Sequence, residues 1–230
     1  MNRKNKLSNY GIVFTIFLFF ATLINAQTAV QDSLLYLKNP NYLHELGLLE
    51  VYKTKQADIV MLGNSITHGA NWNELLGRNG VVERGIPSDI VDGFYARIGG
   101  IIKLKPKLCF IMGGINDIYN WTPVEKIFEK YVKILTELKK NNIKPIVQST
   151  LYVGVKWKSY ADRNREVAKL NKMLMDYAKK NVIDYVDLNK KMSTKNILNN
   201  DITIDGLHLN GKGFGIWALE LEKILRKYNF

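Results

Sequence analysis

The sequence predicts an α/β protein in which one parallel sheet is covered by helices on both sides. Short apolar runs of strand length alternate with longer segments whose apolar residues recur at helical spacing. The run 108–112 is apolar throughout, as expected for a central strand of a parallel sheet. No internal repeat or linker-like stretch divides the alternation. We therefore expect one three-layer α/β/α sandwich with a five-stranded parallel sheet.

The first half of the predicted domain begins with a helix over 42–52, where apolar residues recur at helical spacing. The run 57–62 has β-branched residues near its centre and predicts the first strand. A short helix over 72–76 ends at a glycine, and 81–84 forms the second strand. A helix over 90–104 follows and is stopped by a proline.

The second half continues the alternation after the third strand, 108–112. Thr122 and Pro123 open a helix that runs amphipathically to about Lys140. The remaining expected elements are a strand at 145–149, a long loop at 150–160, a helix at 162–180, a strand at 182–186 and a closing helix at 214–227.

Residues 1–30 differ from the rest of the chain. The first six residues carry three positive charges, and the apolar stretch Gly11–Ile24 is shorter than the roughly 20 residues of a membrane-spanning helix. Ala26 is a small residue that closes this stretch before polar sequence begins. The pattern predicts a secretory signal peptide over 1–26, one domain over 27–230, and export to the periplasm or beyond in a bacterium. A retained N-terminal anchor is the alternative.

The composition argues against several function classes. Cys109 is the only cysteine and lies in an apolar run, so it predicts a buried, inert thiol and no intramolecular disulfide. The net charge is +12, but many lysines fall on the expected outer faces of helices, without an interleaved aromatic stripe. We expect no nucleic-acid partner and no stable membrane insertion after signal cleavage. Acidic glycans or anionic surfaces stay open as partners, and the sequence does not fix the oligomeric state.

The turn after the first expected strand carries the candidate nucleophile. Gly63 lets the backbone bend sharply where the strand ends. Ser65 then stands where a helix would begin, at the sheet edge where open α/β sheets hold their ligands. On this stretch alone, a nucleophile and a helix N-cap are about equally supported.

A serine nucleophile needs a base, and the chain has three histidines. His44 falls in the N-terminal helix. His68 shares a helical turn with Ser65, and its side chain would lie along that helix, away from the exposed side of the serine. His208 follows Asp205 by three residues, so the carboxylate could orient the imidazole through Nδ1–H. We expect His208 as the base; a loop in which both residues merely satisfy backbone groups is the competing explanation.

Three donors for a developing oxyanion also stand at strand ends. They are the backbone N–H groups of Ser65 and Gly85 and the side-chain amide of Asn116. A plain turn glycine and an Asx-turn or cap are the ordinary explanations for the last two. Together, a nucleophile, a base and oxyanion donors in four separate turns favour an enzyme.

These residues resemble the four sequence blocks of the SGNH (GDSL-like) hydrolases. The blocks are Gly63-Asn64-Ser65, Gly85, Gly114-Ile115-Asn116-Asp117 and Asp205-Gly206-Leu207-His208, in the family's order. The resemblance implies a flavodoxin-like strand order 2-1-3-4-5 and an esterase without metal or organic cofactor. It also implies Ser65 as nucleophile, His208 as base, Asp205 as its orienting partner, and Ser65, Gly85 and Asn116 as the oxyanion hole.

One departure from the familiar motif bears on the substrate. Asn64 stands where the most familiar form has Asp, and this is similar to the branch of platelet-activating-factor acetylhydrolase-like and carbohydrate acetylesterase members. Tyr119, Trp121 and Trp157 could rim the cleft and contact a sugar face, or they could be packing residues. The resulting expectation is a serine esterase for acetyl esters of carbohydrates. A lysophospholipase or thioesterase and a non-catalytic glycan-binding module are the alternatives.

Overall fold

The computed structural model describes residues 35–230, and its centre is one parallel sheet. The strands lie in the order β2-β1-β3-β4-β5, and every adjacent pair is parallel. Their bounds are β1 Ile59–Gly63, β2 Val81–Gly85, β3 Leu108–Met112, β4 Lys144–Gln148 and β5 Asp184–Val186. This confirms the predicted five-stranded parallel sheet and the 2-1-3-4-5 order.

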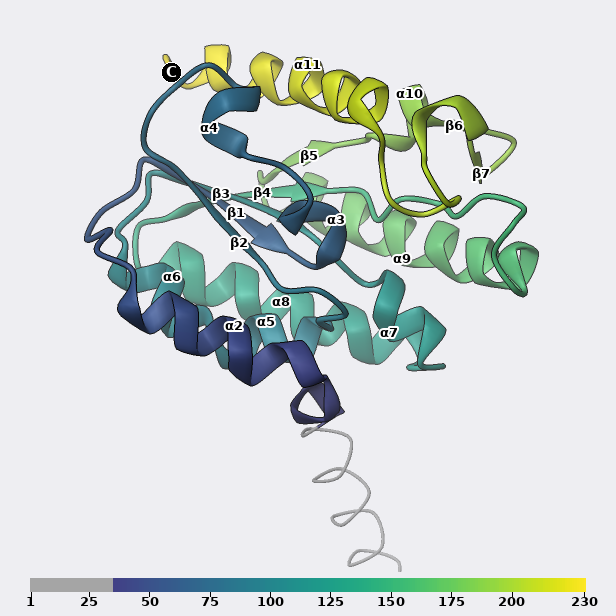
Figure 1. The fold of residues 1–230 in the computed structure, drawn as a ribbon, viewed down its shortest axis with the longest axis horizontal. Coiled ribbons are helices and arrows are strands. Elements are labelled where there is room, and N and C mark those ends of the chain that lie inside the picture. The colour runs from purple at the N-terminus through teal and green to yellow at the C-terminus, as the bar shows by residue number, and fades with distance from the viewer. Residues whose placement is uncertain (1–34) are drawn as a thin grey trace, which may run out of the picture.

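Helices cover both faces of the sheet (Figure 1). On one side lie α3 (Ser65–His68), α4 (Trp72–Leu75) and α11 (Gly211–Lys227). On the other lie α2 (Pro40–Val51), α5 (Val91–Ala96), α6 (Ile98–Lys103) and α8 (Val124–Lys140). The helix α9 (Tyr160–Lys180) packs beside α8 and β5. The shorter elements are η1 (Leu35–Lys38), α7 (Ile115–Tyr119), α10 (Asn189–Met192), β6 (Ser193–Thr194), β7 (Ile197–Leu198) and η2 (Asn200–Ile202).

The core lies between the sheet and its two helical layers. Every residue of β1 and β3 is buried, as a sheet covered on both faces requires. On one side, Trp72 of α4 and Trp217 of α11 meet edge to face with ring centroids 4.8 Å apart. Cys109 in β3 is fully buried, and burial raises the pKa of its thiol, so the side chain is held neutral.

Several predicted bounds differ from the observed ones by one to three residues, and two differences have a visible structural cause. The predicted helix over 90–104 is broken at Arg97 into α5 and α6, because the Arg97 guanidinium turns inward. It donates to the carbonyl oxygens of Arg84 and Gly63, each at 3.0 Å, and pairs with the carboxylate of Asp89 at 3.0 Å. The predicted strand over 182–186 starts later, at Asp184, because the Ile183 N–H donates to the carbonyl of Ala178 at 2.9 Å and closes the turn that follows α9.

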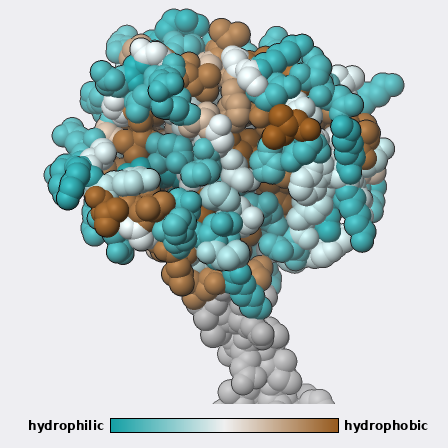
Figure 2. Space-filling model, in the orientation of Figure 1, coloured by the Kyte–Doolittle hydropathy of each residue, from teal (hydrophilic) through white to brown (hydrophobic). Residues whose placement is uncertain are grey.

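The predicted signal peptide over 1–26 lies outside the described residues. Within 35–230, no helix combines the length and the apolar character needed to cross a membrane. The face drawn in Figure 2 is largely hydrophilic, with apolar side chains scattered among polar ones.

Candidate active site

Ser65 is the first residue of α3, directly beyond the carboxyl end of β1. Gly63 is required at the bend, because a Cβ there would overlap the hydroxyl of Thr67. The N-cap of α3 is Asn64, whose Oδ1 accepts a hydrogen bond from the Ile66 N–H at 3.0 Å. The capping role considered for Ser65 therefore belongs to its neighbour, and the serine hydroxyl is free to contact another group.

That group is His208. The distance from Ser65 Oγ to His208 Nε2 is 3.0 Å, although the two residues are 143 positions apart in the chain. His208 Nδ1 lies 2.6 Å from Asp205 Oδ2. The three side chains form one continuous chain of hydrogen bonds, which is the arrangement in which a carboxylate orients a histidine toward a serine.

The second oxygen of Asp205 fixes the carboxylate in place. Asp205 Oδ1 accepts hydrogen bonds from the backbone N–H groups of Leu207 and His208, both at 2.8 Å. Partial burial raises the pKa of Asp205, but the hydrogen bonds from the His208 ring and from both N–H groups outweigh it and leave the pKa below its ordinary value. The carboxylate therefore stays ionised beside the imidazole, and it both orients the ring and satisfies the backbone.

The other two histidines lie elsewhere. His68 Nδ1 is 3.5 Å from Glu83 Oε2, so its ring faces the end of β2. His44 is on the exposed side of α2. Within the described residues, neither forms a hydrogen bond or an ion pair with Ser65 or Asp205.

The three expected oxyanion donors have different surroundings. The Ser65 N–H is at the start of α3, where a helix offers no internal acceptor. The side-chain amide of Asn116 donates one hydrogen bond to the Asp89 carbonyl at 2.8 Å, which leaves its second N–H for another acceptor. The Gly85 N–H donates to the carboxylate of Glu83, so in this arrangement it is already engaged.

Ser88 lies in the turn after β2, shortly after Gly85, and was not among the expected site residues. Ser88 has φ 61°, a left-handed conformation that is uncommon outside glycine, and its side chain is exposed. Its backbone N–H has no acceptor within residues 35–230. The turn is held against the nucleophile turn by the Ile86 N–H, which donates to the Gly63 carbonyl at 3.2 Å. The only sequence signal is position, because this turn directly follows a parallel strand.

The three aromatic candidates differ in what their rings contact and in how exposed they are. Trp157 donates its indole N–H to the Asp205 carbonyl at 3.0 Å, and Tyr119 packs edge to face on it at 5.5 Å. Trp121 is 69% exposed and stacks on the guanidinium of Arg163. Arg163 is buried and was not anticipated; it also donates to the Ile118 carbonyl at 2.5 Å. Of the three, Trp121 is the one with a largely open ring.

No three His, Cys, Asp or Glu side chains gather into a possible metal site within the described part of the chain.

Comparison with known proteins identifies the family of this chain. The sequence pattern of the GDSL-like Lipase/Acylhydrolase family matches residues 61–216, which include the turns of Ser65 and His208. A crystal structure from Bacteroides fragilis, assigned as an acylhydrolase, is 30% identical with a TM-score of 0.70; the match covers 76% of this chain and 92% of that one. The structure of an acetyl xylan esterase has a TM-score of 0.63 at 20% identity, over 73% of this chain and 98% of that one, and shows the shared fold.

A further match is confined to part of a larger protein. The N-acylneuraminate cytidylyltransferase of Streptococcus agalactiae serotype V is 30% identical over 99 residues, which make up 43% of this chain and 23% of that protein. This match says nothing about the remaining three quarters of the relative. The family pattern, by contrast, spans most of the chain that the structure describes. The chain belongs to the GDSL-like lipase/acylhydrolase family and is a carboxylic ester hydrolase.

Proposed function

We propose that this protein is a serine esterase in which Ser65 is the nucleophile, His208 the general base and Asp205 the orienting carboxylate. The observation that carries the proposal is the continuous chain from Ser65 Oγ to His208 Nε2 (3.0 Å) and from His208 Nδ1 to Asp205 Oδ2 (2.6 Å). Both distances are those of direct hydrogen bonds, so proton transfer needs no bridging water.

The reaction proceeds in two halves. His208 Nε2 takes the hydroxyl proton while Ser65 Oγ attacks the ester carbonyl, and the imidazolium then protonates the departing alcohol. Water, deprotonated by the same nitrogen, attacks the acyl-enzyme, and the acid leaves as Ser65 recovers its proton. Asp205 remains ionised and stabilises the imidazolium in both halves.

The oxyanion is held by backbone and amide donors near Ser65. We assign this role to the Ser65 N–H and to the second side-chain N–H of Asn116. The free N–H of Ser88 is a third candidate. Gly85 stays a prediction, and it requires the carboxylate of Glu83 to leave the Gly85 N–H.

The proposed substrates are acetyl or other short acyl esters of carbohydrates. The exposed ring of Trp121 offers an apolar plane of the kind that packs on sugar faces. A structure with the same fold is that of an acetyl xylan esterase. The predicted signal peptide favours export, where such glycans are met.

A lysophospholipase or thioesterase is the alternative within the same chemistry, and the family's own description includes lipases. A non-catalytic glycan-binding module is the alternative from another class. The intact hydrogen-bond chain at Ser65 argues against the second alternative, since a binding module has no use for an oriented base.

Two measurements test the proposal. A fluorophosphonate probe should label wild-type protein at Ser65, and an unlabelled protein would reject a serine esterase. A series of p-nitrophenyl esters from acetate to palmitate should favour acetate, and acetate should be released from O-acetylated glycans. Activity that rises beyond about eight carbons, each buried CH₂ contributing roughly 0.8 kcal/mol, would favour the lipid alternative.

A further inference from the structure

The segment that follows β4 connects the buried interior to the turn that carries Asp205 and His208. We call residues 150–157 the β4 arm. The sequence predicts a loop here, but backbone groups of Thr150, Tyr152 and Val153 are paired with side chains. The pairing partners are side-chain amides of three asparagines that are each at least nine-tenths buried: Asn164, Asn171 and Asn189.

Two of these asparagines hold the arm from α9. Asn171 accepts from the Thr150 N–H and donates to the Thr150 carbonyl, both at 2.8 Å. Asn164 makes the same pair of hydrogen bonds with Val153, both at 2.9 Å. Each amide therefore copies the donor and acceptor pattern of a neighbouring strand and fixes both backbone groups of one residue.

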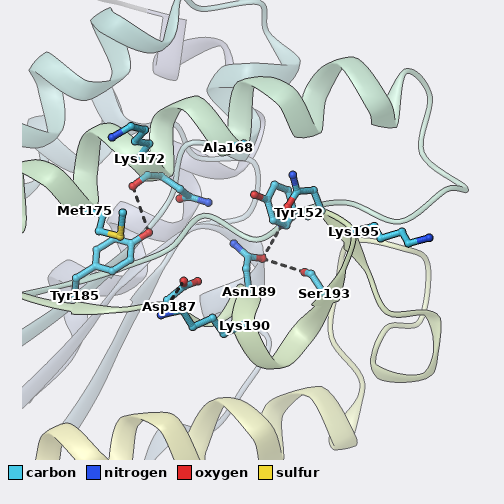
Figure 3. A pocket seen from close by; sticks show the side chains of 12 residues that line it. Tyr152, Ala168, Lys172, Met175, Tyr185, Asp187, Asn189, Lys190, Ser193 and Lys195 are labelled. Atoms are coloured by element: carbon cyan, nitrogen blue, oxygen red, sulfur yellow. Dashed lines mark hydrogen bonds and ion pairs between the residues drawn. The ribbon is translucent and has the colours of Figure 1, made fainter.

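The third asparagine holds the arm from α10, as Figure 3 shows beside the pocket that it borders. Asn189 donates to the Thr150 carbonyl at 2.8 Å, and its Oδ1 accepts from the Tyr152 N–H at 3.2 Å. The Ser193 hydroxyl lies 3.1 Å from the same oxygen. With its polar groups satisfied inside a buried environment, the base of the arm is a rigid support.

The far end of the arm contacts two consecutive carbonyl groups of the catalytic turn. The Gly154 N–H donates to the Gly206 carbonyl at 2.7 Å, and the Trp157 indole N–H donates to the Asp205 carbonyl at 3.0 Å. The two segments touch so closely that a Cβ on Gly206 would lie 3.0 Å from the Trp157 ring. The indole therefore sits against the backbone that determines where the Asp205 carboxylate points.

We propose that Trp157 is a positioning residue that acts on His208 through Asp205, with the β4 arm as its support. This inference rests on the proposed roles of Ser65, His208 and Asp205. It replaces the expectation that Trp157 binds sugar, because the indole N–H is bonded to the Asp205 carbonyl and Tyr119 already packs edge to face with the ring. By binding the Asp205 carbonyl, the Trp157 indole keeps the Asp205 carboxylate within hydrogen-bond distance of His208 Nδ1. A displacement of a catalytic group by about 1 Å can lower the rate by roughly 100-fold.

The test removes the indole N–H and little else. Trp157→Phe keeps an aromatic ring against Gly206 and Tyr119 but cannot donate to the Asp205 carbonyl. We expect kcat on p-nitrophenyl acetate to fall roughly 10- to 100-fold with KM unchanged. The acidic limb of the kcat/KM profile should also move to lower pH, because a loosened Asp205 stabilises the His208 imidazolium less.

Tyr228→Phe is the control. It removes the hydrogen bond from the Tyr228 hydroxyl to the carboxylate of Asp184, at the amino end of β5 and away from the catalytic turn, and leaves the Trp157 N–H in place. Its kcat and pH profile should stay near those of wild type. A Trp157→Phe protein with normal kcat and a raised KM would overturn the inference and return Trp157 to the substrate-binding residues.

A second variant covers the case in which phenylalanine disturbs folding. Replacing Trp157 by β-(3-benzothienyl)alanine keeps a bicyclic aromatic side chain and puts a sulfur, which cannot donate a hydrogen bond, in place of the N–H. The NMR resonance of the His208 Nδ1 proton, which reports the bond to Asp205 without any turnover, should shift in this variant. An unchanged resonance would overturn the positioning role, whether or not the protein is an esterase. The esterase proposal is tested separately: it would be rejected if the fluorophosphonate probe failed to label Ser65 in the wild type, and the resonance would still decide the role of Trp157.

Discussion

Two roles fall to Asn64 and Ser65, the N-cap of a helix and the candidate nucleophile, and the sequence alone does not assign them. Either residue type can cap a helix, and the spacing alone gives no preference. In the structure the amide oxygen of Asn64 takes the cap, so the serine hydroxyl turns to His208. Within residues 35–230 the buried Asn64 side-chain nitrogen has no hydrogen-bond partner, which is a local cost of this arrangement.

The roles of the histidines give the first prediction. Ser65→Ala and His208→Ala should each lower kcat by several orders of magnitude, as removal of one member of a triad does. His68→Ala should keep most activity, because the His68 ring faces Glu83. Steady-state hydrolysis of p-nitrophenyl acetate decides between them. Loss of activity in His68→Ala together with an active His208→Ala would transfer the role of the base to His68.

The oxyanion donors give the second prediction. Asn116→Ala should lower kcat by roughly 10²–10³ with little change in KM, because the amide acts on charge that develops in the transition state. Asn120→Ala, an exposed asparagine at the end of the same short helix, is the control and should behave as wild type. If Asn116→Ala raised only KM, the amide would be a substrate contact instead.

At the scale of elements, the sequence was sufficient where one pattern dominated and failed where a side chain reached across elements. The buried strands β1 and β3 and the amphipathic helix α8 have their expected places. The break at Arg97 could not be foreseen, because it depends on carbonyl groups that only the fold brings together. The hydrogen bond of the Gly85 N–H could not be foreseen either, because its acceptor is the flexible side chain of Glu83.

The inward Arg97 gives the third prediction. Arg97→Met leaves the Asp89 carboxylate buried without its partner and should lower the free energy of unfolding by about 3–5 kcal/mol. Replacing both residues, as Arg97→Met with Asp89→Asn, should recover part of this loss because no charge is then buried. Urea unfolding at pH 7 measures both variants. Equal losses in the single and double variants would show that the charge of Asp89 is not the cause.

At the scale of the whole molecule, the layer order and the meeting of four distant turns at one sheet edge followed from the alternation of elements and from the family resemblance. What the sequence did not reveal is how that edge is supported. Asn164 and Asn171 stand seven residues apart on the apolar face of α9, among Val167, Leu170 and Leu174. Polar residues at buried helical positions were a visible signal, but their backbone partners on the β4 arm were not.

Buried carboxyl groups also make the stability of the whole domain depend on pH. Asp117 is fully buried, and burial raises its pKa to about 7, although its oxygens accept from the Val91 N–H at 3.1 and 3.2 Å. An unfolded Asp ionises near pH 4, so between about pH 4 and 7 the folded protein binds the extra proton. Stability contributed by this group is therefore present below pH 4 and lost as the pH rises toward 7.

Asp117→Asn should remove this dependence. The amide keeps an oxygen for the Val91 N–H and carries no charge. At pH 4 the contribution of this residue to the free energy of unfolding should therefore be nearly the same in the variant and the wild type. At pH 8 the variant should have gained free energy of unfolding relative to wild type, on the order of a few kcal/mol. Glu129→Gln, an exposed carboxyl on the neighbouring helix α8, is the control and should follow the wild-type curve. A difference between Asp117→Asn and wild type that stays constant from pH 4 to 8 in urea unfolding would show that Asp117 is ionised throughout this range in the folded protein.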